Sequence, residues 1–122
     1  MIHLIIVAFS GALGTLARYG ALKWVGTHNF PWGTFTVNVV GSFVMGVLFV
    51  LIAEKGIVNP SIRPYVMTAF LGAFTTFSTF SLDTFQLIES GQLLSALLYI
   101  LGSVVLCVLV LSVGIFGARS IF

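Results

Sequence analysis

Residues 93–116 read LLSALLYILGSVVLCVLVLSVGIF, a run without a single charged side chain. A helix of this length is long enough to cross a hydrocarbon core roughly 30 Å thick. Similar uncharged, apolar stretches lie at residues 1–17, 24–53 and 64–82. The sequence therefore predicts an all-α integral membrane protein.

The composition of the whole chain supports this prediction. Of the 122 residues, 59% are hydrophobic and 7% are charged, whereas about 25% of the residues in soluble domains are charged. So few charged groups cannot cover the surface of a small water-soluble monomer. The net charge of +2 is spread along the chain, so we expect no nucleic-acid partner. The single cysteine, Cys107, excludes a disulfide within the chain.

Turn-forming residues divide the chain into four predicted spans. Asn29–Gly33, Lys55–Pro60 and Ser90–Gly91 mark the three connections. We expect one transmembrane domain, residues 1–122, with helices at about 2–19, 33–53, 64–86 and 93–116. Arg18 is expected to end the first helix and to extend toward the membrane surface.

The basic residues do not fix an orientation in the membrane. With four spans, Lys55, Arg63 and Arg119 lie on one side, and Arg18 and Lys23 lie on the other. The positive-inside rule needs a clearer excess than this. The chain can therefore have one orientation, or it can insert in both orientations and form antiparallel pairs.

The third span contains the most polar stretch within the predicted membrane region. In TTFSTFS, residues 75–81, every side chain is either a hydroxyl group or a phenylalanine ring. Hydroxyls can compete with the helical hydrogen bonds, which predicts a break near the middle of this helix with free backbone carbonyls. The alternative is an intact helix whose hydroxyls bond to the carbonyls of the preceding turn.

Neutral donors also follow the other helices. Side chains that form hydrogen bonds occur four residues apart in the second span and again in the fourth: Thr34, Asn38 and Ser42, then Tyr99, Ser103 and Cys107. Phe77 and Phe80 share a helix face, and the electropositive edge of an aromatic ring can attract a small anion. The alternatives are packing contacts for the rings and an interhelical hydrogen bond for Asn38.

Two further features of the sequence are the glycines within its spans and the catalytic and charged groups that it lacks. Glycines that can let helices pack closely occur in three spans: Gly11, Gly14, Gly41, Gly46, Gly102 and Gly114. The sequence contains no pairing of a nucleophile with a base and no metal-binding cluster, so we do not expect an enzyme. Coupled transport usually needs a titratable group within the membrane, but the second and fourth spans contain no Asp, Glu, Lys or Arg, and only Asp83 lies near the end of the third.

The third-span stretch GAFTTFSTFS, residues 72–81, closely resembles the signature of the Fluc fluoride channels, the CrcB family. Gly11-x-x-Gly14-x-x-x-Arg18 and Gly33-Thr34-x-x-Val37-Asn38 match the family in the same order. The resemblance covers essentially the whole chain. It implies a multi-pass inner-membrane channel through which fluoride leaves the cytoplasm passively, protecting the cell from fluoride toxicity.

The resemblance also implies an antiparallel, dual-topology homodimer with two pores and a structural sodium ion at the dimer interface. The sodium ligands would be the backbone carbonyls of Gly72 and Thr75. The residues implied along the fluoride pore are Asn38, Phe77, Phe80, Ser78, Thr79, Tyr99 and Ser103. Cys107 stands where the family leads us to expect a hydroxyl.

Two other functions remain as alternatives. A small dual-topology multidrug exporter has a similar size, but its mechanism needs a carboxylate in the first helix, and residues 2–17 contain none. A non-transporting accessory subunit would use its polar faces to contact neighbouring proteins and would move no ion.

Overall fold

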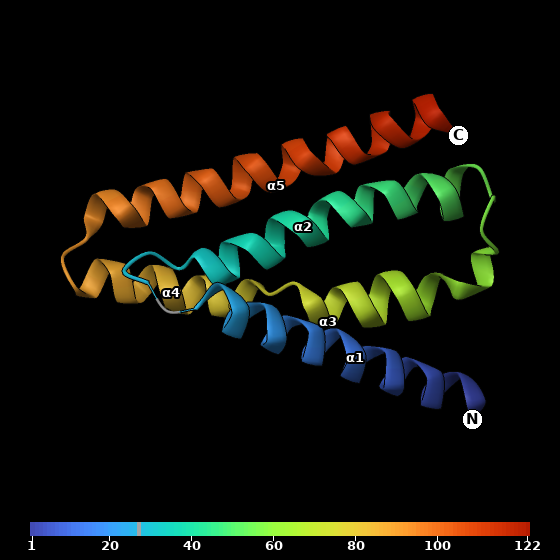
Figure 1. Cartoon of the computed structure of the whole chain (residues 1–122), viewed down its shortest axis with the longest axis horizontal. Coiled ribbons are helices and arrows are strands. Elements are labelled where there is room, and N and C mark those ends of the chain that lie inside the picture. Colours follow the sequence, from blue (N-terminus) through green and yellow to red (C-terminus); the bar gives the residue numbers. More distant parts are fainter. Residues whose placement is uncertain (27) are drawn as a thin grey trace.

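The computed structural model describes residues 1–26 and 28–122, which form a bundle of long helices (Figure 1). Four segments are long and apolar enough to cross a membrane: Ile2–Val25, Trp32–Glu54, Pro60–Glu89 and Leu93–Ile121. Among the described residues there is no strand. The expectation of an all-helical chain with four membrane-spanning segments is therefore confirmed.

The helices extend further than the sequence predicted. Helix α1 covers Ile2–Val25 and α5 covers Leu93–Ile121, so both continue beyond the expected ends at residues 19 and 116. Arg18 and Arg119 lie inside these helices. The prediction that Arg18 ends the first helix is wrong, because a charged side chain does not interrupt the backbone hydrogen bonds that define a helix.

The second and third segments contain irregular turns. Helix α2 (Trp32–Leu48) continues as η1 (Phe49–Glu54), and the short turn η2 (Pro60–Ile62) leads into η3 (Pro64–Leu71). Both η1 and η3 have the wide winding of a π-helix, in which hydrogen bonds join residues five apart. Asn59 begins η2, since its side chain accepts a hydrogen bond from the Ser61 N–H at 3.0 Å.

Helical backbone stops briefly within the third segment. The short helix α3 (Gly72–Phe74) and the helix α4 (Phe77–Glu89) are separated by Thr75 and Thr76. Thr75 has φ −83° and ψ 160°, and Thr76 has φ −153° and ψ 125°, so both residues are extended. The Thr75 N–H still donates to the Leu71 carbonyl at 3.0 Å, whereas the Thr76 N–H needs a partner outside the helical ladder.

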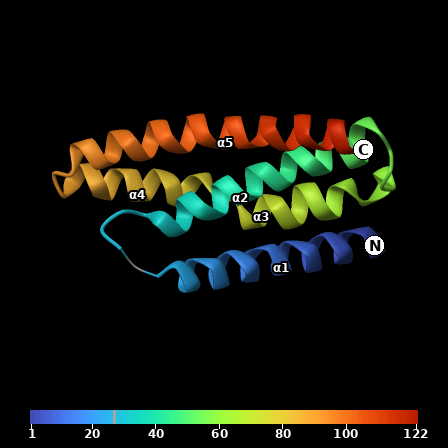
Figure 2. The same cartoon turned by 45° about the horizontal axis from the view of Figure 1, so that its top comes forward.

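The helices pack as an antiparallel bundle with both termini at the same end (Figures 1 and 2). The most extensive contact joins α2 and α5, whereas α1 packs against η3 and α3. Helix α4 packs against the N-terminal part of α5, with Phe80, Leu87, Ala96 and Tyr99 forming a small buried cluster. The extended residues of the third segment thus lie inside the bundle, between α1 and α2.

Glycines permit the closest approaches between helices. A Cβ atom on Gly46 of α2 would lie 2.2 Å from the Leu111 carbonyl oxygen, and one on Gly114 of α5 would lie 2.6 Å from the Phe43 carbonyl oxygen. A Cβ atom on Gly14 of α1 would lie 2.2 Å from the Phe70 carbonyl oxygen. Backbone thus meets backbone at these positions, as in other tightly packed membrane helices.

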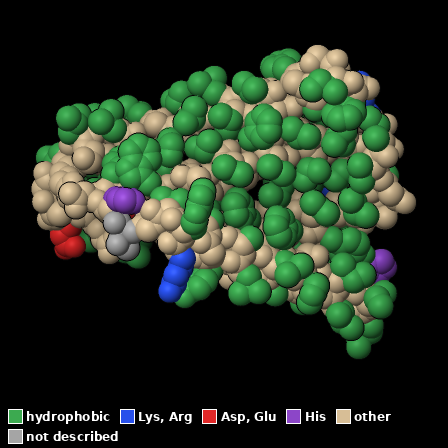
Figure 3. Space-filling view, in the orientation of Figure 1, with side chains coloured by type: hydrophobic (Ala, Val, Ile, Leu, Met, Phe, Trp, Pro, Cys, Tyr) green, Lys and Arg blue, Asp and Glu red, His purple; other side chains and the backbone are tan. Residues whose placement is uncertain are grey.

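The outer faces of the bundle are apolar. Large aliphatic and aromatic side chains are exposed along α1 and α5, and apolar side chains cover much of the face shown in Figure 3. Water would disfavour such a surface, whereas lipid or another membrane helix would cover it without cost. The fold therefore suits a hydrocarbon environment.

Candidate functional site

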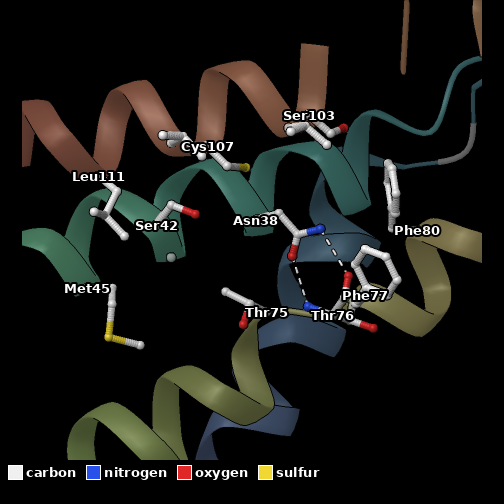
Figure 4. Close-up of a pocket in the computed structure, with 13 residues that line it drawn as sticks. Asn38, Ser42, Met45, Thr75, Thr76, Phe77, Phe80, Ser103, Cys107 and Leu111 are labelled. Atoms are coloured by element: carbon white, nitrogen blue, oxygen red, sulfur yellow. Dashed lines mark hydrogen bonds between the residues drawn. The ribbon is translucent and has the colours of Figure 1, made fainter. Parts of the chain in front are cut away.

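A cavity of about 350 Å³ lies between α2, α5 and the extended residues of the third segment (Figure 4). Helices α2 and α5 supply most of its wall: Asn38, Gly41, Ser42 and Met45, with Ser103, Val104, Cys107, Val108 and Leu111. Thr75, Thr76, Phe77 and Phe80 complete it. None of these lining residues carries a charge, so the cavity combines neutral donors with apolar side chains.

Asn38 holds the extended backbone in place. Its Nδ2 donates a hydrogen bond to the Thr76 carbonyl oxygen at 3.0 Å, and the Thr76 N–H donates to Asn38 Oδ1 at 2.8 Å. One side chain therefore bonds to both backbone polar groups of Thr76, and it supplies the partner that the Thr76 N–H lacks within the helical ladder. The amide still has a second N–H that neither of these bonds uses.

The five hydroxyls of residues 75–81 divide into two groups. Thr75 and Ser81 donate to the carbonyls of Leu71 and Phe77, four residues earlier, as the intact-helix alternative expects. Thr76 Oγ1 instead lies 3.2 Å from Thr79 Oγ1 and 3.5 Å from Ser78 Oγ. It also accepts from the Thr79 N–H at 3.3 Å, and so caps α4.

The aromatic rings form a continuous series from the cavity into the core. The Phe77 and Phe80 ring centroids are 5.4 Å apart, and those of Phe80 and Tyr99 are 4.9 Å apart. Phe77 is 76% exposed, while Phe80 is buried and Tyr99 is fully buried. The two phenylalanines thus meet at the cavity, but one is fixed by packing and the other is not.

Ser103 presents an unusual hydroxyl to the same cavity. The residue is 6% exposed, and its Oγ has no hydrogen-bond partner among residues 1–26 and 28–122. Cys107, one turn further along α5, also lines the cavity, and Figure 4 shows its sulfur directed toward the space beside Asn38. A buried hydroxyl without a partner is costly, so this wall of the cavity favours a polar occupant.

A second cavity, of about 580 Å³, lies at the end of the bundle beyond Phe80. Thr34, Thr79 and Asp83 line it, together with polar residues of the helix connections. Tyr99 Oη donates to Asp83 Oδ2 at 3.0 Å, which brings the buried ring into contact with the wall of this cavity. The polar stripe expected on the second span is therefore divided, because Thr34 faces this cavity while Asn38 and Ser42 face the first.

The residues expected along a pore are thus only partly brought together. Asn38, Phe77, Phe80 and Ser103 line the first cavity, and Thr79 lines the second. Ser78 and Tyr99 line neither, since Ser78 lies beside Thr76 Oγ1 and Tyr99 is buried behind Phe80.

The two backbone carbonyls expected to bind sodium belong to Gly72, the first residue of α3, and to Thr75, which directly follows α3. The Thr76 N–H would be the helical partner of the Gly72 carbonyl, but it bonds to Asn38 instead. The Thr75 carbonyl accepts one long hydrogen bond, 3.4 Å, from Arg18 Nη1. The expectation that Arg18 extends toward the membrane surface is therefore wrong, because its guanidinium turns inward to this carbonyl.

Three contacts that the sequence did not predict contribute to the site. Thr76 caps α4, Arg18 reaches the Thr75 carbonyl, and Asp83 accepts from Tyr99. A signal was present for Thr76, because a threonine directly before the first residue of a helix is a common N-cap. The other two contacts join residues distant in sequence and leave no local pattern.

Comparisons with known proteins agree with this geometry. Residues 5–115 match the family described as CrcB-like protein, Camphor Resistance (CrcB). A Hahella chejuensis protein named Fluoride-specific ion channel FluC is 49% identical over 122 residues, covering 98% of this chain and 96% of its own length. Proteins of the same name from Magnetococcus marinus and Rhizobium johnstonii are 48% and 45% identical, covering 94% and 99% of this chain and 96% and 99% of themselves. The match along nearly the whole chain shows that this protein belongs to the CrcB family.

Proposed function

We propose that this protein is a fluoride-specific ion channel that lets fluoride leave the cell passively through the cytoplasmic membrane and so limits fluoride toxicity. Full-length relatives that carry this name support the proposal. The observation that carries it in this chain is the uncharged cavity, in which an amide, hydroxyls and two phenylalanine side chains meet at the extended residues of the third segment. Residues from three of the four segments that are long and apolar enough to cross a membrane line that cavity.

The chemistry of the cavity wall suits a small, strongly hydrated anion. Fluoride must exchange its water for other donors, and the free N–H of Asn38 and the unpartnered Ser103 hydroxyl offer two. The edges of Phe77 and Phe80 add weak positive potential beside them. Several weak sites without a full positive charge allow an ion to enter and also to leave.

We further propose that two copies pair in antiparallel orientation, each chain inserting both ways. The even distribution of basic residues and the apolar outer faces support such a pair. Phe77 is largely exposed in the single chain, so a partner surface would complete its surroundings. Tags on the C-terminus should then react from both sides of the membrane, and labelling from one side alone would contradict the pairing.

A sodium ion at this interface fits the groups that the chain presents. Extended backbone in membrane helices supplies carbonyl ligands for sodium, and the Gly72 carbonyl has lost its helical amide partner to Asn38. Gly72 is exposed, so its carbonyl can meet that of a second copy. With Thr75, each chain would offer two oxygen ligands. A bound sodium ion would supply a fixed positive charge near the pores.

Fluoride efflux from liposomes distinguishes this function from the alternatives. Purified protein in vesicles loaded with potassium fluoride should release fluoride when valinomycin allows potassium to leave, and a fluoride electrode records the rate. A multidrug exporter would instead need a proton gradient and a drug, and an accessory subunit would release nothing. Efflux no faster than from vesicles without protein would refute the proposal that this chain is a fluoride channel.

A further inference from the structure

Arg18 brings a full positive charge to Thr75 and Thr76, the extended junction between α3 and α4. Its Nη1 donates to the Thr75 carbonyl oxygen at 3.4 Å. Thr75 lines the first cavity, whereas Arg18 lines neither of the two cavities described above. The guanidinium therefore contacts a residue of the cavity wall without being part of the wall itself.

The packing of α1 holds Arg18 against this peptide. Gly14 lies one helical turn earlier on the same face of α1. A Cβ atom on Gly14 would lie 2.2 Å from the Phe70 carbonyl oxygen and 3.1 Å from the Ala73 Cβ. The two segments thus touch one turn before Arg18 and shortly before Thr75. Close backbone packing therefore places the partly buried Arg18 side chain beside Thr75.

A chain of hydrogen bonds joins Arg18 to Asn38, the amide of the cavity wall. The Thr75 carbonyl and the Thr76 N–H belong to one planar peptide group. Arg18 donates to the oxygen of this group, and the N–H of the same group donates to Asn38 Oδ1 at 2.8 Å. Asn38 Nδ2 uses one N–H to bond to the Thr76 carbonyl and keeps the other free. The chain therefore runs from the guanidinium, through two amide groups, to a donor of the cavity wall.

Each bond in this chain polarises the next in the same direction. A cation at a carbonyl oxygen draws electron density from the nitrogen of that amide, so its N–H becomes a stronger donor. Thr76 passes the effect to Asn38 Oδ1, and the Asn38 side chain passes it to its own N–H groups. The charge also acts through space, and it is weakened less by protein than by water. Both effects make the Asn38 amide more attractive to an anion.

We propose that Arg18 is a positioning residue of the fluoride pathway, which strengthens Asn38 as an anion donor through the peptide group between Thr75 and Thr76. A guanidinium inside the cavity would hold an anion tightly and delay its departure, because conduction needs weak sites. One peptide group away, the same charge acts on a neutral donor instead of on the ion. The effect on efflux rests on the proposed function, whereas the effect on the Asn38 amide does not.

The nuclear magnetic resonance signals of the Asn38 side-chain amide test the polarisation without any ion flow. Isotope labelling of asparagine in detergent-solubilised protein gives signals from Asn29, Asn38 and Asn59, and Asn38→Ala identifies the one of interest. Arg18→Gln keeps a hydrogen-bond donor but removes the charge, whereas Arg18→Lys keeps both. We expect the Asn38 amide protons to move to lower chemical shift in Arg18→Gln and to stay near their wild-type positions in Arg18→Lys. Unchanged Asn38 signals in Arg18→Gln would overturn the proposal.

Fluoride efflux tests whether the stronger donor serves conduction. Arg18→Gln should slow efflux by about tenfold, and Arg18→Lys should keep most of the wild-type rate. Lys23→Gln is the matched control, because it removes the same charge from the same helix. Lys23 lies over the Tyr19 ring, with its Nζ 5.3 Å from the ring centroid, and lines neither cavity, so efflux should not change. The sodium concentration is the same in all samples, since sodium is proposed to share the Thr75 carbonyl.

The outcomes separate this proposal from that of the channel. Equal losses of efflux in Arg18→Gln and Lys23→Gln would overturn the role of Arg18, because net charge alone would explain them. Efflux as slow in Arg18→Lys as in Arg18→Gln would also overturn it, since the charge would then have no part. Wild-type protein that passes no fluoride would refute the channel, while the Asn38 signals would still decide whether Arg18 polarises that amide.

Discussion

The α2–α5 contact and the α3–α4 junction differ in how their backbone polar groups find hydrogen-bond partners. Along α2 and α5, backbone hydrogen bonds stay within continuous helices, and Gly46 and Gly114 let the two backbones touch. At the junction, Thr75 and Thr76 are extended, and side chains of Arg18 and Asn38 bond to the Thr75 carbonyl and to both backbone polar groups of Thr76. The first region can tolerate no added atoms, and the second depends on a few polar bonds. Close packing of α2 against α5 therefore holds the bundle together, and we call this packed pair the frame. Side-chain hydrogen bonds, in contrast, position the residues of the site.

The largest effect is expected where the frame has no spare room. Gly46→Leu places a side chain against the Leu111 backbone, so the cost should exceed the about 1–3 kcal/mol typical of overpacking and should abolish folding. Size-exclusion chromatography in detergent measures the loss of monodisperse protein. Gly117→Leu is the control, because nothing lies within 4 Å of its Cβ position. Equal behaviour of the two variants would show that the α2–α5 contact is not the frame.

Asn38→Ala should disrupt the junction while leaving the frame assembled. Removal of the amide leaves the Thr76 N–H without a partner, at about 1–3 kcal/mol, and takes one hydrogen bond from the Thr76 carbonyl. The protein should therefore unfold at a lower concentration of denaturing detergent. Its fluoride efflux should fall to the rate measured from vesicles without protein. Val40→Ala, at an exposed position on the same helix, should change neither quantity. An Asn38→Ala protein with normal stability would show that the hydrogen bonds between Asn38 and Thr76 do not hold the junction together.

The two phenylalanines should separate packing from conduction. Phe80 is buried against Tyr99, so Phe80→Ile should reduce efflux strongly and also lower stability by about 1 kcal/mol. Phe77 is 76% exposed, so Phe77→Ile should reduce efflux with little change in stability. Efflux and detergent unfolding of both proteins give the comparison. If efflux were unchanged in both variants, the ring edges would have no part in fluoride passage.

A small effect on stability is expected for Arg18→Gln. The contact of Arg18 with the Thr75 carbonyl is 3.4 Å long, and a glutamine can still donate a hydrogen bond. We expect a loss of stability of less than about 1 kcal/mol, measured by the same detergent titration. A loss as large as that of Asn38→Ala would mean that Arg18, rather than Asn38, holds the junction.

The sequence predicts the membrane-spanning segments and the site to different extents. The four spans were predictable because apolar runs such as residues 93–116 reflect the thickness of the membrane. Their ends were not, because α1 continues past Arg18, which was expected to end it, and α5 continues past residue 116. Charge reports where water is near, whereas hydrogen bonding decides where a helix stops.

The site was predictable by residue type but not by pairing. A cluster of hydroxyls and rings identified residues 75–81, yet which hydroxyls bond backward and which surround Thr76 depends on the extended dihedral angles. Asn38 was identified as a donor, but its contact with Thr76 joins positions 38 residues apart. Ser78 and Tyr99 line neither cavity of the single chain, and their place along a pore stays a prediction.

The central claim is that uncharged donors and ring edges at the junction select a small halide, and competition between halides tests it most directly. Vesicles containing the wild-type protein are loaded with equal amounts of fluoride and chloride, and ion-selective electrodes follow both ions after valinomycin is added. We expect fluoride to leave rapidly while chloride stays at the level of empty vesicles. Release of both ions at similar rates would contradict the claim, because a nonselective pathway would need none of the groups that meet at Asn38.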